Sequence, residues 1–177
     1  MEVFSGNWRF WKERGLHRLA IADVGNEAIL PRFLTGAWVT HNPDGDTIDI
    51  QTADRALVRV RFSGADKPET AQAFWKVARN HLSTVAKGQQ TTAWCYKKDK
   101  YELKVCHVRV GSLDLCLDLI QRGYGWYAHM FSHELSHEQQ AAYAAAEEQA
   151  RARRIGLWSL PDPMPPWECR KFRKAGQ

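Results

Sequence analysis

The chain has 177 residues, enough for one domain with short extensions, and its hydrophobic content of 44% excludes a disordered protein. No stretch is long and apolar enough to cross a membrane, and the charged start does not resemble a secretion signal, so we expect a cytoplasmic protein. The net charge of +5 biases the surface towards polyanions such as nucleic acids.

Composition divides the chain into three parts. Residues 1–35 mix aromatic and basic side chains and are predicted to be an extension of unclear structure. Residues 36–160 carry the regular patterns of a folded domain. Residues 161–177 hold too many prolines for us to expect regular structure, and this tail includes four basic residues, Arg170, Lys171, Arg173 and Lys174.

Within the domain, apolar and polar side chains alternate in short runs, which is typical of half-buried strands. The predicted strands cover residues 37–40, 47–50, 56–62, 91–96 and 103–110. Helices are predicted over residues 69–86, 113–122 and 136–154. Five short strands with a helix between the third and fourth are typical of an OB-type barrel. The sequence therefore predicts an α+β fold, a five-stranded barrel with three helices and a polyanion-binding groove.

The four cysteines are widely spaced and contain no C-x-x-C pair, which argues against a zinc ribbon. Cys106 and Cys116 lie among apolar residues, so we expect reduced thiols in the core. A second zinc pattern, H-E-x-x-H, runs from His133 to His137. It requires both histidines in one helix, whereas Ser136 and Gln139 form a capping box that starts the helix after His133. We therefore reject a zinc protease.

Carboxylates gather in two segments that a strand meander brings together. Asp46 opens one predicted strand, and Asp66 follows the end of the neighbouring strand. Adjacent strands lie about 4.8 Å apart, so the two carboxylates can meet at one end of the barrel. Such hard oxygen ligands suit calcium or magnesium, with Asp44 available to hold bound water.

Two further residues complete a hydrolytic set. Arg61 projects from the third strand, and its planar fork matches a phosphate. Glu69 is placed at the start of the predicted helix, where a carboxylate can orient a water. A metal, an arginine and a carboxylate base are what an attack of water on a phosphodiester requires.

These motifs resemble the staphylococcal nuclease family. The resemblance is carried by Asp-Gly-Asp-Thr at 44–47 and Arg-x-x-Gly-x-Asp-x-Pro-Glu at 61–69, and it continues in order to about residue 168. It implies that Asp46 and Asp66 ligate calcium together with the Lys67 carbonyl, with magnesium or manganese as alternatives. It also implies that Arg61 binds the scissile phosphate, that Glu69 acts as general base, and that DNA or RNA is the substrate. No protein partner can be deduced.

The sequence departs from the family at a second arginine that contacts the phosphate. An ungapped match places Leu103 at that position and Glu102 at a family glycine. Either Lys104 or Lys100 substitutes, or the enzyme is slow, or catalysis has been lost and the chain is a nucleic-acid-binding module.

Three aromatic residues occupy places that resemble the family's nucleotide contacts or their neighbours. These are Tyr101, His129 and Phe131, and Lys100 lies beside the first of them. Packing at the rim of the domain is a comparable reading for each.

Overall fold

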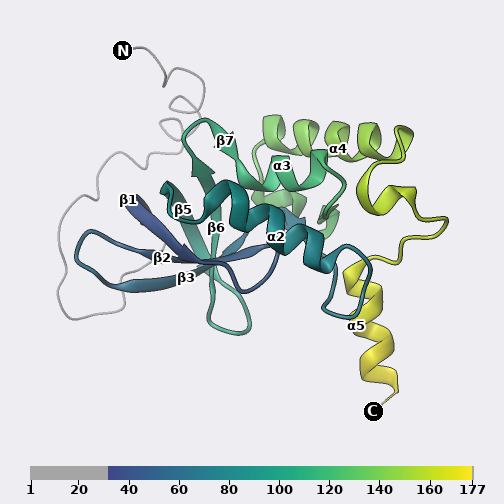
Figure 1. Cartoon of the computed structure of the whole chain (residues 1–177), viewed down its shortest axis with the longest axis horizontal. Helices are drawn as coiled ribbons and strands as arrows, with labels where there is room; N and C mark the ends of the chain where they lie inside the picture. Colours follow the sequence, from purple (N-terminus) through teal and green to yellow (C-terminus); the bar gives the residue numbers. More distant parts are fainter. Residues whose placement is uncertain (1–31, 177) are drawn as a thin grey trace.

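The computed structural model describes residues 32–176, so the expectations for residues 1–31 lie outside that range. Its centre is a closed barrel (Figure 1). The barrel strands are β1 (Arg32–His41), β2 (Thr47–Gln51), β3 (Leu57–Phe62), β5 (Gln90–Lys98) and β6 (Lys104–Val110). They pair in the order β3-β2-β1-β5-β6, and a parallel pairing of β3 with β6 closes the sheet. The predicted five-stranded barrel is confirmed.

Three shorter strands attach other segments to this barrel. β7 (Leu113–Asp114) pairs antiparallel with the end of β6. β4 (Ala65–Asp66) pairs with β8 (Trp126–Tyr127) in a separate two-stranded sheet. In that sheet Asp66 lies opposite Trp126. Strand β8, which is not part of the barrel, therefore helps to hold the backbone of Asp66 in place.

The three predicted helices are present and pack on the barrel (Figure 1). They are α2 (Trp75–Ala86), α3 (Leu115–Gln121) and α4 (His137–Ala152), and short 3-10 helices cover His129–Glu134 (η1) and Gly156–Ser159 (η2). The predicted capping box is confirmed, since Ser136 and Gln139 each accept from the other's backbone. The helix thus begins at His137, and His133 lies outside it, in η1.

The start of α2 differs from the prediction. The helix begins at Trp75 rather than at Glu69, because Phe74 adopts a left-handed backbone with a φ of 66°. That conformation breaks the helical path, and residues 69–74 form turns instead. Within α2, every fourth residue is buried, which seats the helix on the barrel.

The expectation of an irregular tail is wrong. Residues Pro166–Ala175 form a helix, α5, beside the loop that joins β4 to α2 (Figure 1). Proline suits the first turn of a helix, Glu168 complements its positive end, and Arg173 and Lys174 complement its negative end. Trp167 packs against a small cluster that includes Trp126 and Trp158. This tertiary contact anchors a helix too short to be stable alone.

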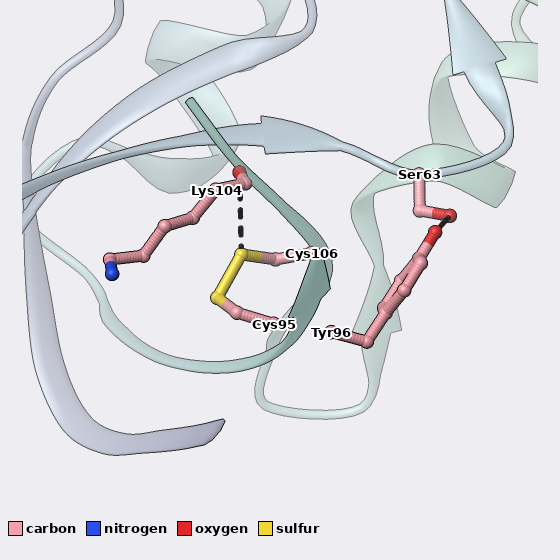
Figure 2. The surroundings of a disulfide bond; sticks show 5 residues. All are labelled: Ser63, Cys95, Tyr96, Lys104 and Cys106. Atoms are coloured by element: carbon pink, nitrogen blue, oxygen red, sulfur yellow. Dashed lines mark hydrogen bonds between the residues drawn. A yellow bond between two sulfur atoms is a disulfide. The ribbon is translucent and has the colours of Figure 1, made fainter. Parts of the chain in front are cut away.

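The main core fills the barrel and continues between α2, α3 and α4. Within it, Cys95 and Cys106 form a disulfide between paired positions of β5 and β6 (Figure 2). The expectation of a reduced Cys106 is therefore wrong, because strand register, which composition does not reveal, sets the two residues opposite each other. Cys116 is a buried free thiol, as predicted. Among the described helices, none is long and apolar enough to span a membrane.

Candidate active site at one end of the barrel

Asp46 ends the tight loop that enters β2, and this loop packs directly on α2. Asn42 donates to the Arg79 carbonyl at 2.8 Å and so ties the loop to the helix. At Gly45, a Cβ would lie 2.8 Å from the Cβ of Ala78, so only glycine permits this contact. The glycine between Asp44 and Asp46 is therefore required by packing. It leaves Asp46 buried and in place at the mouth of the barrel.

Arg61 joins the two predicted metal ligands. Its Nη2 atom lies 3.7 Å from Oδ2 of Asp46 and 3.5 Å from Oδ1 of Asp66. Arg61 is held in β3 opposite Thr47, the residue that follows Asp46. Gly64, with a φ of +83°, makes the turn that returns the chain into β4 and Asp66. Strand register thus brings the three side chains to one end of the barrel.

Asp46 is a buried carboxylate with weak compensation. Burial raises its pKa to about 7, although the charge of Arg61 opposes the shift. Its Oδ1 atom accepts from the Thr47 hydroxyl at 3.2 Å, whereas the Lys67 amide is 3.5 Å from Oδ2. Arg61 lies deep enough for burial to lower its pKa, but Asp46 and Asp66 outweigh that effect and raise it. The site is therefore short of positive charge near Asp46.

Glu69 lies in the loop ahead of α2, so the predicted position at a helix start is wrong. Its Oε1 atom accepts from Arg170 at 2.7 Å, and Oε2 accepts from Arg173 at 2.6 Å. Burial raises the pKa of Glu69, but hydrogen bonds and charge from Arg170 and the charge of Lys67 produce a net lowering. The carboxylate is therefore ionised at neutral pH, with both oxygens engaged.

Lys67 and Asp44 form the outer edge of the site. The Lys67 side chain is only 15% exposed, and its Nζ atom lies 3.6 Å from Oδ2 of Asp44. Asp44 also accepts from the Asp46 amide at 3.3 Å. Asp44 thus stabilises the loop that carries Asp46, and the role predicted for it, holding metal-bound water, stays a prediction.

Lys104 does not face the other site residues. In the parallel ladder, Lys104 pairs with Val60 and Val105 pairs with Arg61, so Lys104 and Arg61 project from opposite faces of the sheet. Figure 2 shows the Lys104 side chain extending away from Ser63. Leu103 lies just before β6, and its carbonyl accepts from the Asp99 amide at 2.8 Å. We therefore do not retain Lys104 as the substitute for the missing arginine.

The loop between β5 and β6 carries Lys100 and Tyr101. Asp99 holds its shape by accepting from the Tyr101 and Leu103 amides, and the other Asp99 oxygen lies 3.6 Å from Arg61. Tyr101 is 65% exposed, and the Lys100 ammonium lies over its ring. The loop therefore presents an aromatic ring and a charge near Arg61.

His129 is placed by the segment that follows β8. Its imidazole packs against the Tyr127 ring and lies 3.2 Å from a carboxylate oxygen of the buried Glu147. The side chain is 59% exposed. Tyr127 itself is paired with Ala65, next to Asp66 in β4. His129 therefore lies two residues beyond β8, the strand that pairs with the one carrying Asp66.

Two site residues were missed by sequence reasoning, Arg170 and Arg173 of α5. Arg170 Nη2 donates to Oδ2 of Asp66 at 2.6 Å and Nη1 donates to Glu69, while Arg173 donates to the other oxygen of Glu69. Burial lowers the pKa of Arg170, but its bonds with Asp66 outweigh this and raise it. The Pro-Pro-Trp-Glu start of α5 was the available sign of a helix; nothing local indicated that its arginines reach the barrel.

Comparison with known proteins shows the family to which this chain belongs. Residues 59–160 match the family of staphylococcal nuclease homologues. The chain is 32% identical to a micrococcal nuclease of Shigella flexneri over 140 residues, which covers 74% of this chain and 78% of that protein. The chain belongs to the staphylococcal nuclease family.

Other relatives in this family differ in how much of their length is shared. An uncharacterized endonuclease of Haemophilus influenzae is 28% identical over 131 residues, 74% of this chain and 70% of that protein. A staphylococcal-like nuclease of Arabidopsis thaliana is 29% identical over 118 residues, 67% of this chain. The chain spans only 35% of that plant relative, and 33% of a protein of Capnoides sempervirens.

The residues of this family member fit a divalent cation. Asp46 and Asp66 offer hard oxygen atoms, and Asp46 is a buried carboxylate whose closest guanidinium nitrogen is 3.7 Å away. Across residues 32–176, no three Asp, Glu, His or Cys side chains cluster as a ready metal site. The hard oxygen donors that lie beside Arg61 in this part of the chain are those of Asp46, Asp66 and Asp99.

Proposed function

We propose that this chain is a calcium-dependent nuclease that hydrolyses DNA and RNA phosphodiester bonds with little sequence preference. The observation that supports it best is the meeting of Asp46, Arg61 and Asp66 at one barrel end, with Glu69 linked to Asp66 through Arg170. Buried carboxylates beside a phosphate-sized cationic fork suit phosphodiester hydrolysis better than binding alone, because a cation can bridge them to a phosphate.

Each side chain has a separate role in this proposal. Arg61 binds the scissile phosphate, since its guanidinium is positioned between two carboxylates and remains 29% exposed. Glu69 orients the attacking water and accepts its proton, for which its lowered pKa keeps it ionised. It must first release one of its two arginine contacts. A calcium ion held by Asp46, Asp66 and the Lys67 carbonyl would supply positive charge near the scissile phosphate.

Substrate contact outside the reacting group is assigned to the loop of Lys100 and Tyr101 and to His129. An exposed aromatic ring can stack on any base, and a lysine can contact phosphates along a strand. Neither contact reads base edges, which agrees with weak sequence preference. The net charge of +5 favours association with nucleic acid.

The alternative is a nucleic-acid-binding module that no longer catalyses. Two observations favour it: Leu103 stands where the family has its second arginine, and arginines occupy both oxygens of Glu69. This reading predicts binding of single-stranded DNA without cleavage.

Cleavage assays separate these two functions. Plasmid DNA, single-stranded DNA and RNA are incubated with the full chain in calcium, magnesium or manganese, and in chelator. We expect cleavage with calcium, none with chelator, and none above background for Arg61→Ala. Retained DNA binding by a parent that cuts no faster than Arg61→Ala would establish the binding module instead.

The cytoplasm remains a prediction for the compartment. The Cys95–Cys106 disulfide weighs against it, because disulfides persist mainly in oxidising compartments. Fractionation of cells that express the full chain, with thiol alkylation before lysis, measures both the compartment and the state of the disulfide.

A further inference from the structure

The barrel supplies one guanidinium to the site, and helix α5 brings a second. Arg61 and Arg170 contact the same oxygen of Asp66, Oδ1, at 3.5 Å and 3.3 Å. Their nitrogen atoms are therefore within about 7 Å of each other. Hydrogen bonds of about 2.9 Å to two oxygens of one phosphate span such a gap.

Packing and hydrogen bonds of neighbouring residues, and not only charge, hold Arg170 beside Asp66. Trp167 packs against the cluster that contains Trp126, and Trp126 pairs with Asp66 between β8 and β4. Gln72 adds a second tie, since its amide donates to the Met164 carbonyl and accepts from the Glu69 amide, both at 2.7 Å. The segment leading into α5 and the loop carrying Glu69 are thus joined on the same side of the site.

The exposure of Arg170 also suits a ligand. Its side chain is 36% exposed, whereas those of its partners Asp66 and Glu69 are 6% and 15% exposed. About a third of the Arg170 side chain is therefore open to solvent beside two carboxylates that are largely buried. A cation bound at Asp66 would compete with Arg170 for that carboxylate, which frees the guanidinium to bind an anion.

We propose that Arg170 is the second phosphate-binding arginine of this enzyme, supplied from the C-terminal helix in place of the barrel position occupied by Leu103. The inference rests on the proposed nuclease function. Two guanidinium groups would then hold the phosphate, one from β3 and one from α5. Arg173, which is 54% exposed and donates to Oε2 of Glu69, orients Glu69.

The test compares four variants of the full chain on single-stranded DNA at saturating calcium. Arg170→Ala is expected to lower kcat/KM about 100-fold, the usual effect of losing one donor to developing charge. Arg170→Lys keeps the charge without the fork and is expected to lose about tenfold. Lys171→Ala, on the same helix and paired with Glu168, is the charge-matched control and should match the parent. Leu103→Arg added to Arg170→Ala should restore most of the rate, because Leu103 is hydrogen-bonded to Asp99, which lies 3.6 Å from Arg61.

Binding provides a readout that does not depend on turnover. Isothermal titration with a nucleoside 3′,5′-bisphosphate in calcium should show a Kd at least about tenfold weaker for Arg170→Ala, as expected for a charged hydrogen bond. Thermal melting checks that each variant is folded, and Arg170→Lys serves if the alanine variant is not.

The outcomes separate this inference from the proposed function. If the parent cuts and Arg170→Ala cuts and binds bisphosphate equally well, only the role of Arg170 is wrong. A faster Arg170→Ala enzyme with tighter calcium binding would show that Arg170 only competes with calcium for Asp66. That result would also overturn the inference. If the parent never cuts, the proposed nuclease function fails, and the bisphosphate titration alone decides whether Arg170 binds phosphate.

Discussion

The site has two halves that are built differently. In the barrel half, Asp46, Arg61 and Asp66 are fixed by strand register and by turns in which glycine is required. In the helical half, Arg170 and Arg173 come from a ten-residue helix seated by Trp167 and by contacts with the site itself. The first half is determined by local sequence patterns and the second by tertiary contact. We therefore expect the barrel half to survive changes that displace the helical half.

The largest expected effect comes from the two aspartates. Asp46→Asn and Asp66→Asn should each abolish calcium binding in calorimetry and lower cleavage by at least about a thousandfold, since a bound metal supplies several kcal/mol to such reactions. Unchanged calcium binding in both variants would contradict the metal assignment.

The same variants differ in stability without metal. Asp46→Asn removes a buried, weakly compensated carboxylate and should raise the melting temperature in chelator. Asp66→Asn removes the shared partner of Arg61 and Arg170 and should destabilise the protein by about 1–2 kcal/mol, a value reduced for the exposure of Arg170. Denaturant unfolding in chelator measures both, and equal shifts would count against the two-part description.

Acid should weaken the barrel through His107. Burial lowers the pKa of this histidine to about 4, and Gln139 lies 3.3 Å from its Nδ1 atom. The unfolded chain binds a proton near pH 6.5 while the folded protein does not, so stability is full above pH 6.5 and falls towards pH 4. We expect a loss of about 2 kcal/mol between pH 7 and pH 5.

Guanidinium unfolding at both pH values checks the role of His107, with His107→Gln as the control. The difference between pH 7 and pH 5 should shrink in that variant. If this difference in stability is unchanged in the variant, other groups cause the acid sensitivity.

Removal of the anchor of α5 should separate the two halves. Trp167→Ala loosens the helix and misplaces Arg170, so cleavage should fall about tenfold while calcium still binds at Asp46 and Asp66. Calcium titration and kcat/KM are measured on the same preparation. Parallel loss of calcium binding would mean that the barrel half depends on the helix after all.

The smallest effect is expected at Lys104. Because it projects from the sheet face opposite Arg61, Lys104→Ala should change kcat/KM less than about twofold, as is usual for a substitution outside the contacts that bind the transition state. A large loss would return Lys104 to the site and displace Arg170 as the substitute arginine.

The sequence predicted the barrel half of the site better than the helical half. The alternating patterns and turn residues predicted five strands, and the carboxylates of the loops before β2 and after β3 were expected to meet because neighbouring strands end together. The capping box at Ser136 located the start of α4 to the residue.

The failures share a physical cause. Glu69 was expected in a helix, but the left-handed backbone at Phe74, a feature set by packing, delays α2. The disulfide of Cys106 and the direction of Lys104 both depend on which residues pair across strands. Arg170 lies 104 residues from Asp66, and no periodicity or composition reports such a contact.

That separation along the chain has a consequence for synthesis. A ribosome completes every strand of the barrel and all its acidic ligands before it reaches the codon for Arg170. A nascent chain with a folded barrel would therefore carry a metal site and a single guanidinium. Full activity would begin only when α5 has emerged from the ribosome and docked on the barrel.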